Sequence, residues 1–374
     1  MGNHNSEFGF LDAARGFCAF VVLLAHIVQI YWLRFVGADS PINAVSSALS
    51  SYAVVTFFLL SGYLITQSIE SNIRRNGQFR VLSYACARVA RIYPPFLVAF
   101  LLTLAVFAIL QSFGLPGRGS PLSFPDDLYA AREIVTLPPK EAVTSLLMLN
   151  GALEVNGPLW SLYMEVKLYA LFACAYCVCL GIARVPASII GIGVLLVALR
   201  FQPDFARYAA LWLLGCVAYY LFARDVPLRS LKMWCSVVAV ATFAAGGRLM
   251  TQFGGATADF SLGDAMLELF IAAIIIVVLV RLRPQLPFGQ RMAPYSYTLY
   301  VIHFPILLLI QSLLVAGGLA GVAIVAVVSA LSVGVVLFLA WWLGSVERRK
   351  QPIQSALESG VLRATARWRA PAAS

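Results

Sequence analysis

Long apolar runs recur along almost the whole chain, and they constrain its fold more than any other feature. The run 319–344, for example, contains no charged residue. About 20 consecutive apolar residues are enough to cross the hydrocarbon core of a bilayer as an α-helix. Within that core every backbone N–H and C=O must find a partner inside the protein, and a single run can do so only as a helix. The sequence therefore predicts an all-α, polytopic membrane protein.

The runs predict about ten transmembrane helices joined by mostly short loops. Only 12% of the 374 residues are charged, compared with about 25% in soluble domains, so little of the chain is left for a domain in water. We assign residues 1–346 to one transmembrane domain. The predicted spans are 10–33, 48–69, 92–113, 158–181, 185–201, 206–223, 231–249, 264–281, 295–316 and 319–344.

The basic residues lie mostly in the loops and favour one side of the predicted spans. With the N-terminus in the cytoplasm, eighteen of the 27 lysines and arginines fall in cytoplasmic segments and seven in outer segments. This asymmetry follows the positive-inside rule and predicts a protein of the cytoplasmic membrane with both termini in the cytoplasm. The formal net charge of +10 forms no single patch, which argues against nucleic-acid binding. Residues 347–374 are expected to form a basic cytoplasmic tail on the inner leaflet.

Seven cysteines lie in or beside the apolar runs. Cys174, Cys177 and Cys179 have a spacing that resembles a set of metal ligands, but no histidine or second cysteine pair accompanies them. We interpret the cysteines as small residues that pack between helices. The sequence predicts neither a metal site nor a tightly bound cofactor.

Ionisable residues inside predicted spans are costly in lipid and indicate function. Arg15 and His26 are eleven positions apart, which leaves them about 20° apart on one helix face. His26 lies about seven residues inside the outer end of its predicted span, and Glu165 lies as far from Pro158, where its span enters the membrane. The counts predict that His26 and Glu165 meet at one depth. Such a pair is typical of a general base oriented by a carboxylate, but it could equally tie two helices together.

The other polar positions in the spans can be interpreted as functional or as structural. Arg88 and Arg91 lie one turn apart, before a helix expected to begin near Pro94, and either bind phosphates or supply ordinary positive-inside charge. Ser61 and Gly62 form a small pair in the middle of a span, where helices or a ligand approach closely. His303, two residues before Pro305, is read as part of a kinked helix, with its ring bonded to a neighbouring carbonyl.

Five segments, taken together, resemble the acyltransferase-3 family. They follow one another in the order in which that family carries its motifs, and they cover residues 11 to about 305. Position 14 is alanine, where family members often carry a larger apolar residue, and position 167 is lysine, where a second polar residue near Glu165 is more usual. The segments are LDAARG at 11–16 followed by His26, FFLLSGYLI at 57–65, RVARIYP at 88–94, NGPLWSLYME at 156–165 and SYTLYVIHFP at 296–305.

The resemblance implies a membrane O-acyltransferase that takes an acyl group, most often acetyl, from cytoplasmic acyl-CoA. The expected acceptor is a hydroxyl of a cell-surface or lipid-linked saccharide. Two alternatives remain: a secreted small molecule such as a macrolide as the acceptor, and a secondary transporter or flippase of the same topology. Lys167 could alter the choice of acceptor or the basicity of Glu165.

The site implied by the resemblance and the spacing has three parts. His26 and Glu165 are the expected catalytic residues, with His26 deprotonating the acceptor hydroxyl or carrying the acyl group itself. The expected donor-binding residues are Arg15, Arg88, Arg91 and Tyr93. The expected supporting residues are Asp12, Ser61, Gly62, Trp160, Ser161 and His303.

Overall fold

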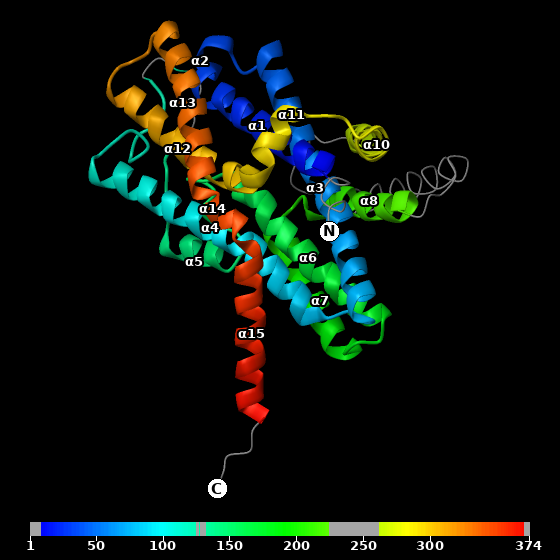
Figure 1. The fold of residues 1–374 in the computed structure, drawn as a ribbon. Helices are drawn as coiled ribbons and strands as arrows, with labels where there is room; N and C mark the ends of the chain where they lie inside the picture. Colours follow the sequence, from blue (N-terminus) through cyan, green and yellow to red (C-terminus); the bar gives the residue numbers. More distant parts are fainter. Residues whose placement is uncertain (1–8, 125–126, 128–131, 224–261, 370–374) are drawn as a thin grey trace.

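The protein is a bundle of long helices (Figure 1). A computed structural model describes residues 9–124, 127, 132–223 and 262–369, and among these it contains no strand. Eight of its helical segments are long and apolar enough to cross a membrane. The prediction of an all-α polytopic membrane protein is confirmed. The eight segments are Gly9–Val36, Pro41–Asn76, Val81–Ser112, Leu159–Cys179, Arg184–Phe201, Phe205–Phe222, Pro287–Ala316 and Val322–Arg363.

Eight of the ten predicted spans correspond to these segments. The predicted span 264–281 coincides with helix α10 (Leu262–Val277) and the π-helical turn η2 (Val278–Leu282) that continues it. The predicted span 231–249 lies outside the described residues. The remaining helices are α5 (Pro139–Leu146), α6 (Leu159–Cys179), α7 (Arg184–Phe201), α8 (Phe205–Ala223), α11 (Pro287–Met292), the 3-10 turn η3 (Ala293–Tyr295) and α12 (Ser296–Ala316).

The first span is one helix with a wider turn inside it. Helix α1 (Gly9–Ile27) passes into a π-helical turn, η1 (Val28–Trp32), and continues as α2 (Leu33–Val36). Such turns add one residue per turn and occur often at functional sites. The wide turn begins two residues after His26, so it determines how the side chains that follow the histidine are placed around it.

The third predicted span begins earlier than expected. Helix α4 runs over Val81–Ser112 and contains Pro94 and Pro95 in its interior, so the expectation that a helix starts at these prolines is wrong. A proline removes one helical hydrogen bond, and inside a helix bundle neighbouring groups compensate for that loss. The consequence for the site is that Arg88 and Arg91 lie within a continuous helix rather than on a loop.

The backbones of helices α3 (Pro41–Asn76) and α8 are in direct contact. A Cβ atom on Gly62 of α3 would lie 2.0 Å from the carbonyl oxygen of Trp212, and one on Gly215 of α8 would lie 2.0 Å from that of Leu59. Small residues allow backbones to approach in this way in membrane proteins. Gly62 therefore serves helix packing, as the sequence suggested first.

Replacing Gly62 by alanine is expected to destabilise the protein by about 1–3 kcal/mol, because the added methyl group forces two helices apart. The midpoint of thermal unfolding in detergent measures the effect. Gly334→Ala is the matched control, since a Cβ there would meet nothing within 4 Å. Equal midpoints for the two variants would contradict the close contact.

The C-terminal helices belong to the bundle at their start. Helix α13 (Val322–Leu343) packs beside α12, and α14 (Ser345–Arg348) leads into α15 (Lys350–Arg369), which contacts α4 and extends away from the bundle (Figure 1). Glu347, which the sequence assigned to the tail, accepts hydrogen bonds from the backbone N–H (3.1 Å) and Oγ1 (3.0 Å) of Thr298. Glu347 thus lies against α12, and a cytoplasmic tail over 347–374 stays a prediction.

Candidate active site

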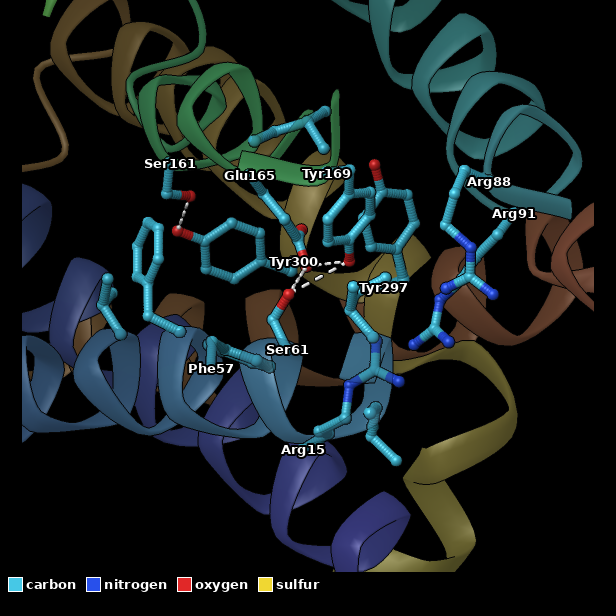
Figure 2. Close-up of a pocket in the computed structure, with 15 residues that line it drawn as sticks. Arg15, Phe57, Ser61, Arg88, Arg91, Ser161, Glu165, Tyr169, Tyr297 and Tyr300 are labelled. Carbon is cyan, nitrogen blue, oxygen red and sulfur yellow. Dashed lines mark hydrogen bonds between the residues drawn. The ribbon is translucent and has the colours of Figure 1, made fainter. Parts of the chain in front are cut away.

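Three arginines from two helices converge on one cavity, which we call the arginine cavity. Arg15 reaches it from α1, and Arg88 and Arg91 reach it from α4 (Figure 2). The opposite wall carries hydroxyl and carboxylate groups, and the rest is apolar. The other lining residues are Val54, Phe57, Phe58, Ser61, Leu64, Ile65, Ser161, Leu162, Glu165, Tyr169, Tyr297 and Tyr300.

Among the described residues, the arginines of this cavity have few hydrogen-bond partners. Arg15 has an ion pair with Asp12 at 3.8 Å, and the Asp12 side chain is 59% exposed. Arg88 donates one hydrogen bond, to Ser68 Oγ (3.1 Å), and its buried Nε atom has no partner. Within the described part of the chain, no side chain or carbonyl accepts a hydrogen bond from Arg91. Buried guanidiniums need anionic or polar partners, so the cavity suits an anionic ligand.

Glu165 faces this cavity and is held by two hydroxyl groups. Ser61 Oγ donates to Glu165 Oε1 at 2.6 Å, and Tyr169, one turn further along α6, also donates to it (Figure 2). The indole N–H of Trp212 donates to Ser61 Oγ at 3.1 Å. The hydroxyl of Tyr297 is buried nearby and has no hydrogen-bond partner in the described part of the chain. These contacts fix the carboxylate on the wall opposite the arginines.

A second cavity, the histidine cavity, contains His26 and has a volume of about 310 Å³. Its polar side chains include Gln29, and its aromatic side chains include Trp160 and Tyr208, whose ring centroids lie 4.9 Å apart. His26 packs against Phe304 at 5.0 Å and stacks on the ring of His303 at 5.2 Å. The remaining lining residues are Val22, Ser50, Ser51, Val54, Arg132, Gly157, Pro158 and Tyr300.

The two cavities share part of their lining. Val54 of α3 and Tyr300 of α12 belong to both. The Tyr300 hydroxyl lies 2.8 Å from Ser161 Oγ, and its ring packs against Phe57 at 5.2 Å. A short partition built from these side chains therefore separates the arginines from His26.

The pair of His26 and Glu165 expected from the sequence is not formed. His26 Nδ1 contacts Gln29 Oε1 at 3.0 Å, whereas Glu165 is bonded to Ser61 and Tyr169. The two side chains line different cavities, so the structure gives His26 a different partner. Glu165 belongs instead with the arginines.

The depth count failed because the first residues of α6, rather than Glu165, lie beside His26: Pro158 and Trp160 line the histidine cavity. The segment before α6 folds into the protein. Asn156 is fully buried, and its amide donates to Thr103 Oγ1 (3.2 Å) and to the carbonyl of Val301 (2.8 Å). The residues at the start of α6, including Trp160, therefore lie at the level of His26. Glu165 lies about 7 Å further along the helix axis, at 1.5 Å per residue.

Lys167 supports the same buried segment and does not contact Glu165. Its ammonium group donates to the carbonyls of Met148 (3.1 Å), Leu149 (2.8 Å) and Tyr163 (3.0 Å). Met148 has a positive φ of 55°, a backbone conformation that non-glycine residues adopt rarely. We conclude that Lys167 stabilises the turn before α6 instead of tuning the carboxylate.

The other expected residues divide between the cavities and the core. Tyr93 lines neither cavity, and its hydroxyl donates to the carbonyl of Leu146 (2.5 Å); its role in donor binding stays a prediction. Trp160 lines the histidine cavity and Ser161 the arginine cavity. His303 is fully buried, with Nδ1 3.1 Å from the carbonyl of Leu299, as the sequence suggested.

Several residues of the site were not singled out from the sequence. Tyr169 follows Glu165 by four positions and Gln29 follows His26 by three, spacings that place side chains on one helix face; this signal was available. Tyr297 and Tyr300 lie inside a motif that the sequence did reveal, but their faces could not be assigned. Arg132 comes from a distant loop, and no local pattern marks it.

The comparison with known families agrees with this geometry. The family described as an acyltransferase domain, acyltransferase-3, matches residues 8–343. The chain belongs to this family. Membership and the eight apolar helices make the chain a multi-pass membrane acyltransferase.

Two curated relatives illustrate the range of the similarity. Protein 2 in the picA locus of Rhizobium radiobacter is 32% identical over 45% of this chain and 81% of its own length. The O-acetyltransferase OatA of Staphylococcus aureus is 22% identical over 82% of this chain. The chain spans 52% of the length of OatA, so it covers about half of that relative. No solved structure matches the chain.

Proposed function

We propose that the protein transfers an acetyl group from cytoplasmic acetyl-CoA to a hydroxyl of a cell-surface or lipid-linked saccharide. The observation that carries this proposal is the pair of adjoining cavities, one lined by three arginines and the other by His26, with Tyr300 and Val54 between them. A donor and an acceptor that approach from opposite sides would meet at this partition.

The arginine cavity is the proposed site of the donor. Guanidiniums bind phosphate oxygens through paired hydrogen bonds, and in the described part of the chain Arg88 and Arg91 use few of their donors. The free volume among the side chains is about 50 Å³, which suits an acetyl group better than a long acyl chain. The printed name of the staphylococcal relative, an O-acetyltransferase, supports the same choice.

The histidine cavity is the proposed site of the acceptor. Ligand pockets combine apolar and aromatic walls with a few polar groups that fix orientation. Trp160 and Tyr208 offer aromatic faces to a sugar ring, and Gln29, Ser50 and Ser51 offer polar groups to its hydroxyls. An acceptor hydroxyl bound here would lie beside the imidazole of His26.

The proposed chemistry is general-base transfer. His26 removes the proton from the acceptor hydroxyl while the oxygen attacks the thioester carbonyl carbon. The carbon–sulfur bond then breaks, and the CoA thiolate takes the proton back from the imidazolium. Alternatively, His26 attacks the thioester carbonyl carbon itself and CoA leaves as the thiolate. The acyl group then passes from the imidazole to the acceptor hydroxyl, whose proton ends on the thiolate. Glu165 would act on the donor side, where Ser61 and Tyr169 hold it.

The orientation in the membrane is also proposed. The turns between α3 and α4 and between α6 and α7 carry Arg74, Arg75, Arg80 and Arg184, and α15 follows the same pattern. The positive-inside rule places such segments in the cytoplasm. Both termini and the arginine cavity would then face the cytoplasm, where acyl-CoA is made.

The test is cleavage of radiolabelled acetyl-CoA by the purified protein in lipid nanodiscs. We expect thiol release that accelerates when a cell-envelope polysaccharide fraction is added, with the label recovered in an alkali-labile ester. A transporter would move a solute without cleaving the thioester. Absence of thiol release both with and without the saccharide fraction would reject the proposal.

The small free volume leads to a prediction about chain length. Octanoyl-CoA is expected to react with a kcat/KM about 10-fold to 100-fold lower than acetyl-CoA, because overpacking costs 1–3 kcal/mol. Phe57→Ala, which enlarges the cavity wall, should recover part of this loss. Phe338→Ala is the control, since that side chain is 61% exposed on α13, away from both cavities. Equal kcat/KM values for both donors in the wild-type protein would contradict the prediction.

A further inference from the structure

The catalytic histidine of the proposed function has one hydrogen-bond partner among the described residues, Gln29. Gln29 Oε1 lies 3.0 Å from His26 Nδ1, and both side chains line the histidine cavity. The two residues belong to the same span, three positions apart, so no other helix has to move to form or maintain the contact. This makes Gln29 the nearest candidate for a group that acts through His26.

The chemistry of the two atoms determines where the imidazole proton lies. An amide oxygen only accepts hydrogen bonds, so Nδ1 of a ring bonded to it must carry the hydrogen. In the neutral ring the lone pair then belongs to Nε2. The hydrogen bond thus leaves the second nitrogen able to take a proton from an acceptor hydroxyl.

The wide turn explains how Gln29 reaches the histidine and stays there. Gln29 lies in the π-helical turn Val28–Trp32. Two aromatic residues of that turn are anchored to α13: the hydroxyl of Tyr31 lies 3.2 Å from Ser332 Oγ, and Trp32 Nε1 donates to Ser329 Oγ at 2.9 Å. The turn, and with it Gln29, is therefore held independently of any ligand.

We infer that Gln29 is the positioning residue for His26: its side-chain oxygen holds the imidazole with Nδ1 protonated and Nε2 free to act as the base. The inference rests on the proposed role of His26. It assigns to Gln29 the part that the sequence assigned to Glu165. Unlike a carboxylate, the uncharged amide of Gln29 orients the imidazole without placing a negative charge beside it.

The other groups near the ring are few, and they matter for the test. Arg132, from the loop before α5, lines the same cavity and is paired with Glu154 at 3.9 Å. His303 of α12 stacks on the ring, and Tyr208 of α8 and Tyr300 of α12 lie in the cavity wall. Among the described residues that line the cavity there is no carboxylate. Introducing one at position 29 is therefore a strong local perturbation.

Kinetics of three variants test the inference. Gln29→Leu, which removes the acceptor atom, is expected to lower kcat about 10-fold or more with little change in the KM for acetyl-CoA, since a general base supplies about 10²–10⁴-fold in all. Gln29→Glu retains an acceptor oxygen and should recover activity at high pH. Gln354→Leu, the same change on α15 and outside both cavities, is the control and should retain wild-type kcat. A kcat for Gln29→Leu equal to that of the wild type would overturn the inference.

Chemical modification of His26 gives a readout that does not need the acceptor. Diethyl pyrocarbonate reacts with the unprotonated imidazole, and mass spectrometry of the peptide that contains His26 follows the rate against pH. A carboxylate beside the ring favours its protonated form. The midpoint of this curve should rise by about one pH unit or more in Gln29→Glu and stay unchanged in Glu165→Gln.

The two readouts separate this inference from the proposed function. The assignment of Gln29 is overturned if the pH midpoint of His26 modification does not rise in Gln29→Glu, whether or not it moves in Glu165→Gln. A midpoint that rises in Gln29→Glu, together with His26→Ala protein that still transfers acetyl, supports the contact but rejects the catalytic role of His26.

Discussion

Replacing His26 by alanine is expected to lower acetyl transfer by about 10²–10⁴-fold, the range that a positioned general base supplies. The fold should survive, because the imidazole makes no hydrogen bond to any other helix that the structure describes. It contacts Gln29 in its own span and the rings of His303 and Phe304. Transfer is measured as labelled ester formed from acetyl-CoA. The fall should be in kcat, with the KM for acetyl-CoA nearly unchanged.

Two checks accompany this prediction. The midpoint of thermal unfolding in detergent should match that of the wild-type protein, which separates a catalytic loss from misfolding. His26→Gln is the matched variant, since it retains a polar side chain in the cavity but cannot serve as the base. More than about a tenth of wild-type turnover in either variant would exclude His26 as base or acyl carrier.

Replacing Arg91 by alanine is expected to raise the KM for acetyl-CoA by about 10-fold to 100-fold, because a charge-assisted hydrogen bond contributes about 1.5–3 kcal/mol. Arg91 is the most direct test of the donor site: none of the described residues accepts a hydrogen bond from it, so the protein loses little when it is removed. Arg88→Ala should act in the same direction. Lysine at either position should rescue binding only in part, because it lacks the planar fork of a guanidinium.

The control for these substitutions is an arginine outside the cavity. Arg75 lies at the C-terminal end of α3, where it donates to the carbonyl of Ser71, so Arg75→Ala changes the charge of that end without altering the cavity. Its KM for acetyl-CoA should stay close to that of the wild type. If Arg91→Ala and Arg75→Ala raise the KM equally, general surface charge attracts the donor. If Arg91→Ala affects the KM of the saccharide instead, the arginine cavity does not bind the donor.

The sequence predicted the helices and the residues that converge far better than it predicted which side chains touch. Apolar runs mark the spans because lipid requires them. Arg15 and the arginines of α4 share a cavity, and the motifs already grouped these residues. The pairing of His26 with Glu165 failed because the first residues of α6, rather than Glu165, lie beside His26. The buried segment around Asn156 is held by Thr103 and Val301, and no local pattern reveals contacts with residues so distant in sequence.

Two further differences have the same origin. Prolines usually end a helix. Pro94 and Pro95 nevertheless lie inside α4, where tertiary packing overrides the local preference. In sequence, Glu347 resembles the start of a charged tail. In the structure its carboxylate accepts two hydrogen bonds from Thr298 of α12. In each case the deciding partner comes from elsewhere in the chain.

The partition formed by Val54 and Tyr300 also has a consequence for the electrical insulation of the membrane. If the two cavities open toward opposite faces, polar interior reaches deep into the bilayer from both sides, and the barrier between them is only a few side chains thick. Narrow apolar constrictions stop ions because water leaves them. Tyr300, whose hydroxyl is bound to Ser161 and whose ring packs on Phe57, would then keep protons from leaking along the path that the acetyl group takes. Tyr300→Ala protein in proteoliposomes is then expected to let protons through faster than the wild-type protein.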